Sequence, residues 1–205
     1  MTTEVDERLL NWRFIVPGEP EGLLLLPAGA ETLPGAVTPE KDTLGLQLPD
    51  RRHPAVAVPD LAAWLPRHRR GTAVRLLADL AATVAPGGWL CAGFANSWYP
   101  VAPLRAGSLS CGRAIRTIRK AGLTGIELYA ALPGHRRAAF LVPLTRRAEM
   151  DHMLRVLFET SFPEGGLGAA ASRRILCILR RAALAAPRTR RHLVPAYYLV
   201  ARRPE

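Results

Sequence analysis

The chain has 205 residues, 49% of them hydrophobic, and a formal net charge of +11 at pH 7. This length and apolar content suit one domain with a substantial core. The acidic N-terminal residues do not fit a signal peptide and no apolar run is long enough to span a bilayer, so we expect a cytoplasmic protein without membrane contact.

The first third of the chain contains short apolar segments separated by proline and glycine. Residues 12–16 form an apolar entry segment, and residues 22–26 have the uninterrupted apolar character of a buried parallel strand. The proline-rich stretch 31–60 leaves room for two short strands, 43–48 and 55–58, and for no helix of normal length.

The middle of the chain has the clearest local signals. Apolar residues at helical spacing predict a helix from Thr72 to Val84, ended by Pro86-Gly87-Gly88. A buried strand is expected over 89–95. Ser110 and Gly122 delimit a second helix, and strands 126–132 and 138–144 are predicted to form a hairpin.

The last part is predicted to hold helices 149–160 and 169–185, joined by the glycine-rich linker 163–168. A short strand, 197–201, closes the chain. Cys91, Cys111 and Cys177 are widely spaced, which supports neither a disulfide framework nor a zinc site and favours buried thiols.

Several of these segments resemble class I S-adenosylmethionine-dependent methyltransferases. In that family a helix ending in Pro-Gly-Gly leads into the fifth strand, and a later helix ending in Ala-Gly-hydrophobic leads into an antiparallel pair at the sheet edge. The matching segments are 76–90, 118–129 and 197–203. The resemblance implies a single α/β domain with a Rossmann-like, methyltransferase-type sheet and an antiparallel edge hairpin.

Within that domain, residues 1–71 correspond to the cofactor half, 72–144 to the well-matched second half, and 145–205 to C-terminal helices and the closing strand. The family places a G-x-G-x-G loop and an acidic residue after the first strand. Here only Gly29 remains, followed by Glu31, and Asp50 is the residue placed to accept hydrogen bonds from the ribose. The distance from Gly29 to Pro86 is also short for the family, so at least one strand-helix unit is missing or stunted.

The shortened cofactor half predicts that S-adenosylmethionine binds weakly or not at all. We therefore expect a non-methylating or repurposed component of a bacterial specialised-metabolite pathway, acting on a small molecule or modified peptide through substrate or partner binding. The alternatives are an active methyltransferase with an unusual loop around Gly29 and a nucleic-acid-binding module.

Polar residues follow the predicted strands at their carboxyl ends, where open parallel sheets bind ligands. The candidate substrate-binding residues are Asp60, Asn96, Ser97, Trp98 and Tyr99. An amide, a hydroxyl and two aromatic rings suit a flat or polar ligand, and the alternative is a loop whose aromatics cap the core. No metal ligand or catalytic residue is assigned, because the five histidines lack partners at ligand spacing and no catalytic motif occurs.

The positive charge is almost all arginine, in dispersed pairs. Arg113, Arg116 and Lys120 share one side of their predicted helix, and Arg173 and Arg180 repeat at a spacing of seven along another. Such stripes suit an acidic peptide or protein partner. A nucleic acid is disfavoured, because aromatic residues are scarce and not interleaved with the arginines.

Overall fold

The computed structural model describes residues 7–26, 36–37, 52–65, 72–99, 107–146, 148–149, 152 and 194–205. They form a mixed α/β structure, as predicted. The elements in chain order are the 3₁₀ helix η1 (Glu7–Ile15), β1 (Gly22–Leu25), β2 (Ala36–Val37), β3 (His53–Val58), the 3₁₀ helix η2 (Leu61–Trp64), α1 (Thr72–Ala82), β4 (Val84–Ala95), α2 (Cys111–Lys120), β5 (Thr124–Leu132), β6 (Phe140–Pro143) and β7 (Ala196–Arg202). In this part of the chain, no helix is long and apolar enough to cross a membrane.

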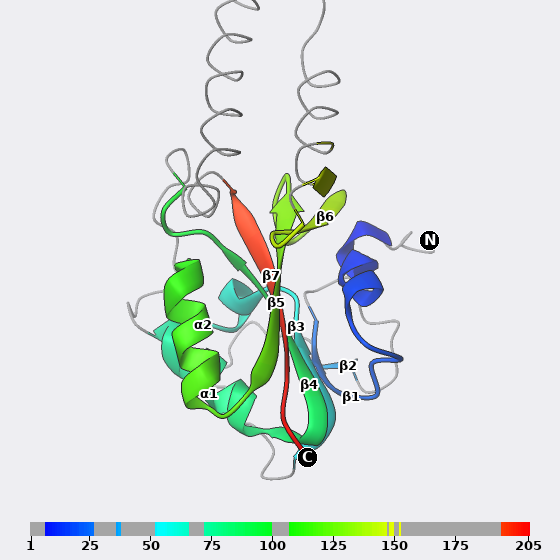
Figure 1. Ribbon diagram of the computed structural model, residues 1–205, viewed down its shortest axis with the longest axis vertical. Helices are drawn as coiled ribbons and strands as arrows, with labels where there is room; N and C mark the ends of the chain where they lie inside the picture. Colours follow the sequence, from blue (N-terminus) through cyan, green and yellow to red (C-terminus); the bar gives the residue numbers. More distant parts are fainter. Residues whose placement is uncertain are drawn as a thin grey trace, which may run out of the picture.

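The strands form one seven-stranded sheet in the order β2-β1-β3-β4-β7-β5-β6. The strands β1 to β4 run parallel to one another. The last strand, β7, is antiparallel to both β4 and β5 and lies between them, as the red ribbon in the middle of the sheet in Figure 1 shows. Consequently β5 runs in the same direction as β4, and β3, β4 and β5 all end at the same edge of the sheet.

Both faces of the sheet are covered. Alternate residues of a strand point to opposite faces. Leu23 and Leu25 of β1 belong to the core beneath α1, with Leu77, whereas Leu24 belongs to the core with Trp12 of η1. Figure 1 shows α1 and α2 on one side of the sheet and the blue η1 on the other. Burial on both faces explains why β1 is an uninterrupted apolar run.

Local signals set both ends of α2 as predicted. The Ser110 hydroxyl accepts a hydrogen bond from the Arg113 N–H at 3.3 Å and so caps the first turn. At the other end Gly122 has a φ of +84°, and the N–H of Leu123 donates to the Ile118 carbonyl at 3.2 Å. This left-handed glycine closes the helix and starts the turn into β5.

The Pro86-Gly87-Gly88 segment lies within β4, so the prediction that it ends the first helix is wrong. Val84 already pairs with β3, and the next paired residue of β4 is Trp89. The residues between them form a bulge in the strand. A Cβ on Gly88 would lie 2.7 Å from the Pro54 carbonyl oxygen, so only glycine allows this close approach of the two strands.

The predicted hairpin and closing strand are confirmed with shifted ends. β5 and β6 pair antiparallel, and β7 extends the predicted strand 197–201 by one residue at each end. The second hairpin strand, Phe140–Pro143, is shorter than the predicted 138–144, and the Ala139 N–H before it donates to the Leu132 carbonyl at 2.7 Å.

Three predicted elements lie wholly or mostly outside the described residues. These are strand 43–48, helix 169–185, and helix 149–160 apart from residues 149 and 152, which are helical. The two-residue strand β2 was not predicted, since so short a pairing leaves no pattern in the sequence.

Arg203, directly after β7, joins the C-terminal ends of α1 and α2. Its Nη2 donates to the carbonyl oxygens of Ala81 at 2.8 Å and Ala121 at 3.2 Å. Carbonyls in the last turn of a helix have no partner within that helix, and the helix dipole favours a cation there. One guanidinium therefore satisfies two helix ends and fixes both to the sheet.

Replacing Arg203 with glutamine should lower the free energy of unfolding by about 1 to 2 kcal/mol, because two charge-assisted hydrogen bonds are lost. Arg202→Gln is the matched control. The side chain of Arg202, the residue before Arg203, is exposed, so its replacement should change the free energy of unfolding by less than about 0.5 kcal/mol. Urea unfolding of the three proteins measures the difference. Equal losses in the two variants would contradict this account of Arg203.

Candidate functional site

The ends of three strands bring polar residues to one edge of the sheet, which we call the carboxyl edge. Asp60 follows β3, residues 96–99 follow β4, and the β5–β6 loop, residues 133–139, follows β5. This edge is where open α/β sheets place their ligands. It is therefore the candidate functional site.

Asp60 is the buried centre of the carboxyl edge, with a side chain that is 3% exposed. Its Oδ1 lies 3.0 Å from Nε2 of His135 and accepts a hydrogen bond from the Ala62 N–H at 3.2 Å. Its Oδ2 lies 2.6 Å from Nε of Arg136. Both oxygens are thus bonded within the protein, and they connect the end of β3 to the β5–β6 loop.

The pKa of Asp60 lies below its ordinary value of 3.8. Burial acts to raise this pKa, because the carboxylate loses its hydration. The hydrogen bond and charge of His135, together with the charge and hydrogen bond of Arg136, act in the opposite direction and outweigh burial. The carboxyl edge therefore contains an ionised, internally compensated carboxylate.

Two further bonds hold the β5–β6 loop in place. The Tyr198 hydroxyl donates to the His135 carbonyl at 2.6 Å, and the Asn11 amide of η1 donates to the Ala138 carbonyl at 2.6 Å. Burial, and to a lesser degree Cys91 and Asp60, raises the pKa of Tyr198 well above its ordinary value, so this hydroxyl remains a donor. The loop is fixed to β3, β7 and η1 together.

His135 is oriented by Asp60, with a side chain that is 9% exposed. A carboxylate that fixes one ring nitrogen of histidine is half of a general-base arrangement. In the described residues, however, no hydroxyl or thiol side chain hydrogen-bonds to the ring. The arrangement supplies an oriented base and positive charge without an activated nucleophile.

Asn96 is a buried structural residue of the carboxyl edge, 1% exposed. Its Nδ2 donates to the Val194 carbonyl at 2.8 Å and the Tyr197 hydroxyl at 3.1 Å, and its Oδ1 accepts from the Trp98 N–H at 3.0 Å. These bonds hold the start of β7 against the end of β4. The amide that we expected to orient a substrate is therefore engaged inside the fold.

The other three candidate residues of this segment lie nearer the surface. Ser97 and Tyr99 are half-buried, and the Trp98 side chain is exposed, with 64% of its surface accessible. Trp98 therefore does not cap the core, which was the alternative for this loop. Binding of a substrate by these three residues stays a prediction.

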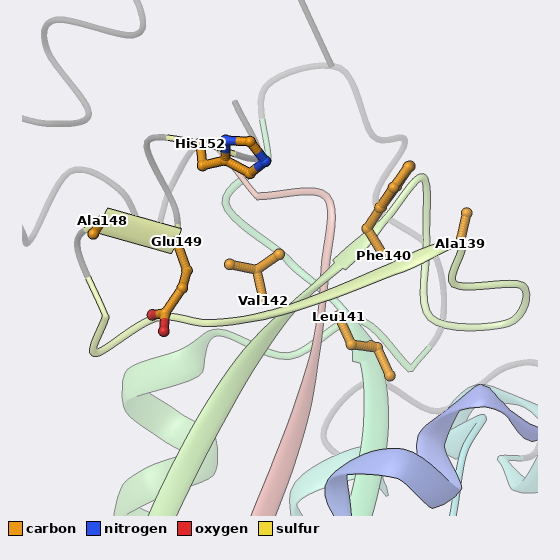
Figure 2. Close-up of a pocket in the computed structure, with 7 residues that line it drawn as sticks. All are labelled: Ala139, Phe140, Leu141, Val142, Ala148, Glu149 and His152. Carbon is orange, nitrogen blue, oxygen red and sulfur yellow. The ribbon is translucent and has the colours of Figure 1, made fainter. Parts of the chain in front are cut away.

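A hollow of about 650 Å³ lies beside β6. Its lining residues are Ala139, Phe140, Leu141, Val142, Ala148, Glu149 and His152. Figure 2 shows Val142 and Leu141 pointing to opposite sides of the strand. Most of the lining is apolar, and none of the predicted substrate-binding residues belongs to it.

Some of the remaining predicted site residues are described by the structure and others are not. Gly29, Glu31 and Asp50, the cofactor candidates, lie outside the described residues, as do Arg173 and Arg180. The predicted partner-binding residues Arg113, Arg116 and Lys120 are all exposed on α2.

The two described cysteines are buried, as predicted. Cys91 and Cys111 are buried, and burial raises the pKa of the Cys91 thiol far above its ordinary value. Across the described ranges, no three His, Cys, Asp or Glu side chains come together as a metal site.

His135 and Arg136 were not predicted as partners of Asp60. They stand 75 and 76 residues further along the chain, in a loop assigned only to a hairpin turn. The signal that would have indicated them is topological: β3 and β5 run in the same direction, so the segments that follow them share an edge.

No protein-family model and no curated protein matches this chain. Among solved structures, it is similar to the [4+2]-cyclase SpnF, with a TM-score of 0.37 and 15% sequence identity. The match covers 82% of this chain and 56% of that one, so the chain spans little more than half of that structure. Similarity this low establishes neither the family nor the activity.

Asp60→Asn should lower the free energy of unfolding at pH 7 by about 2 kcal/mol, because charged hydrogen bonds in a buried site become neutral ones. The unfolded carboxyl protonates near 3.8 and the folded one at lower pH, so the stability that Asp60 provides is present above 3.8 and is lost as the pH falls through the folded value. The difference between wild type and variant should therefore narrow on acidification.

Urea unfolding at pH 7 and pH 3 measures this difference. Asp79→Asn is the control, since Asp79 is 55% exposed and lies 3.9 Å from Arg75. A gap between wild type and Asp60→Asn that is as wide at pH 3 as at pH 7 would refute the assignment of Asp60 as an ionised buried anchor.

Proposed function

We propose that this chain is a methyltransferase-type protein that does not transfer methyl groups and acts by binding a substrate or partner in a bacterial specialised-metabolite pathway. The main support is the difference in strand length between the two sides of β3. β4, β7 and β5 have 12, 7 and 9 residues. On the other side of β3, β1 has 4 residues.

The longer side of the sheet follows the order that the methyltransferase resemblance implies. α1 leads into β4, which contains the Pro86-Gly87-Gly88 segment, and α2 leads through Ala121 and Gly122 into β5. β5 then pairs antiparallel with β7, the closing strand. This order supports a methyltransferase-type architecture for the described residues from 72 onward.

The shorter side is where the cofactor would bind in that family. After β1 the sequence continues Leu26-Pro27-Ala28-Gly29-Ala30-Glu31. Proline fixes the backbone and alanine adds a Cβ, so the close backbone approach that a glycine-rich loop gives to the cofactor is hindered. Asp60, the acid described at the carboxyl edge, is already bonded to His135 and Arg136. These features support a role without S-adenosylmethionine.

Calorimetric titration with S-adenosylmethionine and S-adenosylhomocysteine should give no binding, or dissociation constants in the millimolar range or weaker. Micromolar affinity that Asp50→Ala abolishes would contradict the proposal and favour an active methyltransferase with an unusual loop around Gly29. Asp79→Ala, an exposed acid on α1, is the matched control for the loss of one carboxylate.

The exposed face of α2 supports partner binding. Arg113, Arg116 and Lys120 are spaced along one side of the helix, and α2 contains no acidic residue. Among the described residues, no acidic side chain forms an ion pair with these three cations. An acidic peptide or protein would complement this face.

Replacing Arg113, Arg116 and Lys120 together with glutamine should weaken binding of an oligoglutamate peptide by about tenfold, given that exposed pairs contribute about 0.2 to 1 kcal/mol each. The control removes three exposed arginines elsewhere, Arg13, Arg52 and Arg202. Fluorescence anisotropy at physiological salt measures both.

Equal losses in the two triple variants would show that net charge, not the α2 face, determines binding. Tight binding to random duplex DNA, with a steep loss as salt rises, would instead favour a nucleic-acid-binding module.

A further inference from the structure

Arg136 combines an anchored end with an exposed end. Its Nε lies 2.6 Å from Oδ2 of Asp60, a carboxylate that is 3% exposed, whereas the Arg136 side chain as a whole is 62% exposed. The inner edge of the guanidinium thus faces a buried anion. The outer part reaches the surface at the carboxyl edge of the sheet.

The outer part of this guanidinium keeps its hydrogen-bonding capacity. Arginine has five N–H donors, and the bond to Asp60 uses the one on Nε. In the described part of the chain, the four N–H donors on the two Nη atoms bond to no other residue. Two of them in parallel match the two oxygens of a carboxylate or phosphate.

Arg136 is not needed at this place merely to compensate the charge of Asp60. Asp60 already has His135 and the Ala62 N–H as partners, and the loop is also held by Tyr198 and Asn11. The position of the guanidinium is therefore set on folding. A ligand that binds it loses little additional side-chain freedom, unlike one that must order a mobile surface arginine.

The surroundings favour an anion over a cation. The β5–β6 loop reads Pro-Gly-His-Arg-Arg-Ala-Ala and contains no acidic residue. Arg137, the next residue, is exposed as well. The carboxylate of Asp60 is covered by its two basic partners, so the charged group that reaches the surface is the Arg136 guanidinium.

We propose that Arg136 is a preformed oxyanion-binding residue, which accepts a carboxylate or phosphate group of the ligand at the carboxyl edge. Asp60 is its positioning residue. This proposal rests on the proposed function, the binding of a substrate or partner. It deepens that function because it names the chemical group that is recognised.

The test is a nuclear magnetic resonance titration that follows the Nε–H signals of the arginine side chains. Sodium butyrate and sodium phosphate are the oxyanion probes, n-butanol is the uncharged analogue of butyrate, and sodium chloride at equal ionic strength controls for screening. The expected result is a saturable shift of the Arg136 signal with butyrate or phosphate and no saturable shift with butanol or chloride. A stronger response to one oxyanion identifies the carboxylate or the phosphate as the source.

Arg136→Gln should weaken the oxyanion response of the neighbouring loop amides about tenfold, since one bidentate charge-assisted contact is lost. The control is Arg202→Gln at the end of β7, which removes the same charge from an exposed arginine and should leave the response unchanged. Arg136→Lys keeps the charge without the fork, so it should bind more weakly than wild type even where folding is unaffected.

A non-saturating shift identical to that with chloride, or equal losses in Arg136→Gln and Arg202→Gln, would overturn the inference. Failure of the proposed function has a different signature. It would appear as micromolar binding of S-adenosylmethionine in calorimetry, with the butyrate titration of Arg136 unaffected.

Discussion

The architecture of the carboxyl edge depends on one buried carboxylate. Asp60 cannot remain ionised out of water without partners, and the segment that supplies them is the β5–β6 loop. This requirement fixes the loop relative to β3, and through Tyr198 and Asn11 relative to β7 and η1. Elements far apart in the sequence thereby share a single electrostatic centre. The anion lies in the interior of this centre, and the Arg136 guanidinium is the part that reaches the surface.

Much of the fold between residues 72 and 144 was predictable, because its determinants are local. Ser110 caps α2 with its own hydroxyl, Gly122 ends it with its own left-handed backbone, and apolar spacing marks the buried side of α1. The prediction made from Pro86-Gly87-Gly88 was wrong, because the role of this segment depends on a contact with another strand. Gly88 lies against β3, where the Pro54 carbonyl leaves no room for a side chain, and such a contact is invisible in the local sequence.

The candidate site was predictable in position but not in role. Asp60 and Asn96 do follow strands at the carboxyl edge, yet both side chains bond within the protein, Asp60 to the β5–β6 loop and Asn96 to the start of β7. Whether a polar side chain faces a ligand or its own fold depends on partners from distant segments. His135 and Arg136 became visible only once the strand order was known.

The position of β7 has a consequence for how the protein is made. β7 is synthesised after β4 and β5 but is inserted between them, and the residue after it anchors the ends of both helices. Until β7 leaves the ribosome, the edges of β4 and β5 that it covers are open to other chains. The nascent protein is therefore exposed to aggregation until β7 pairs, and loss of residues 196–202 would remove the centre of the sheet, not its margin.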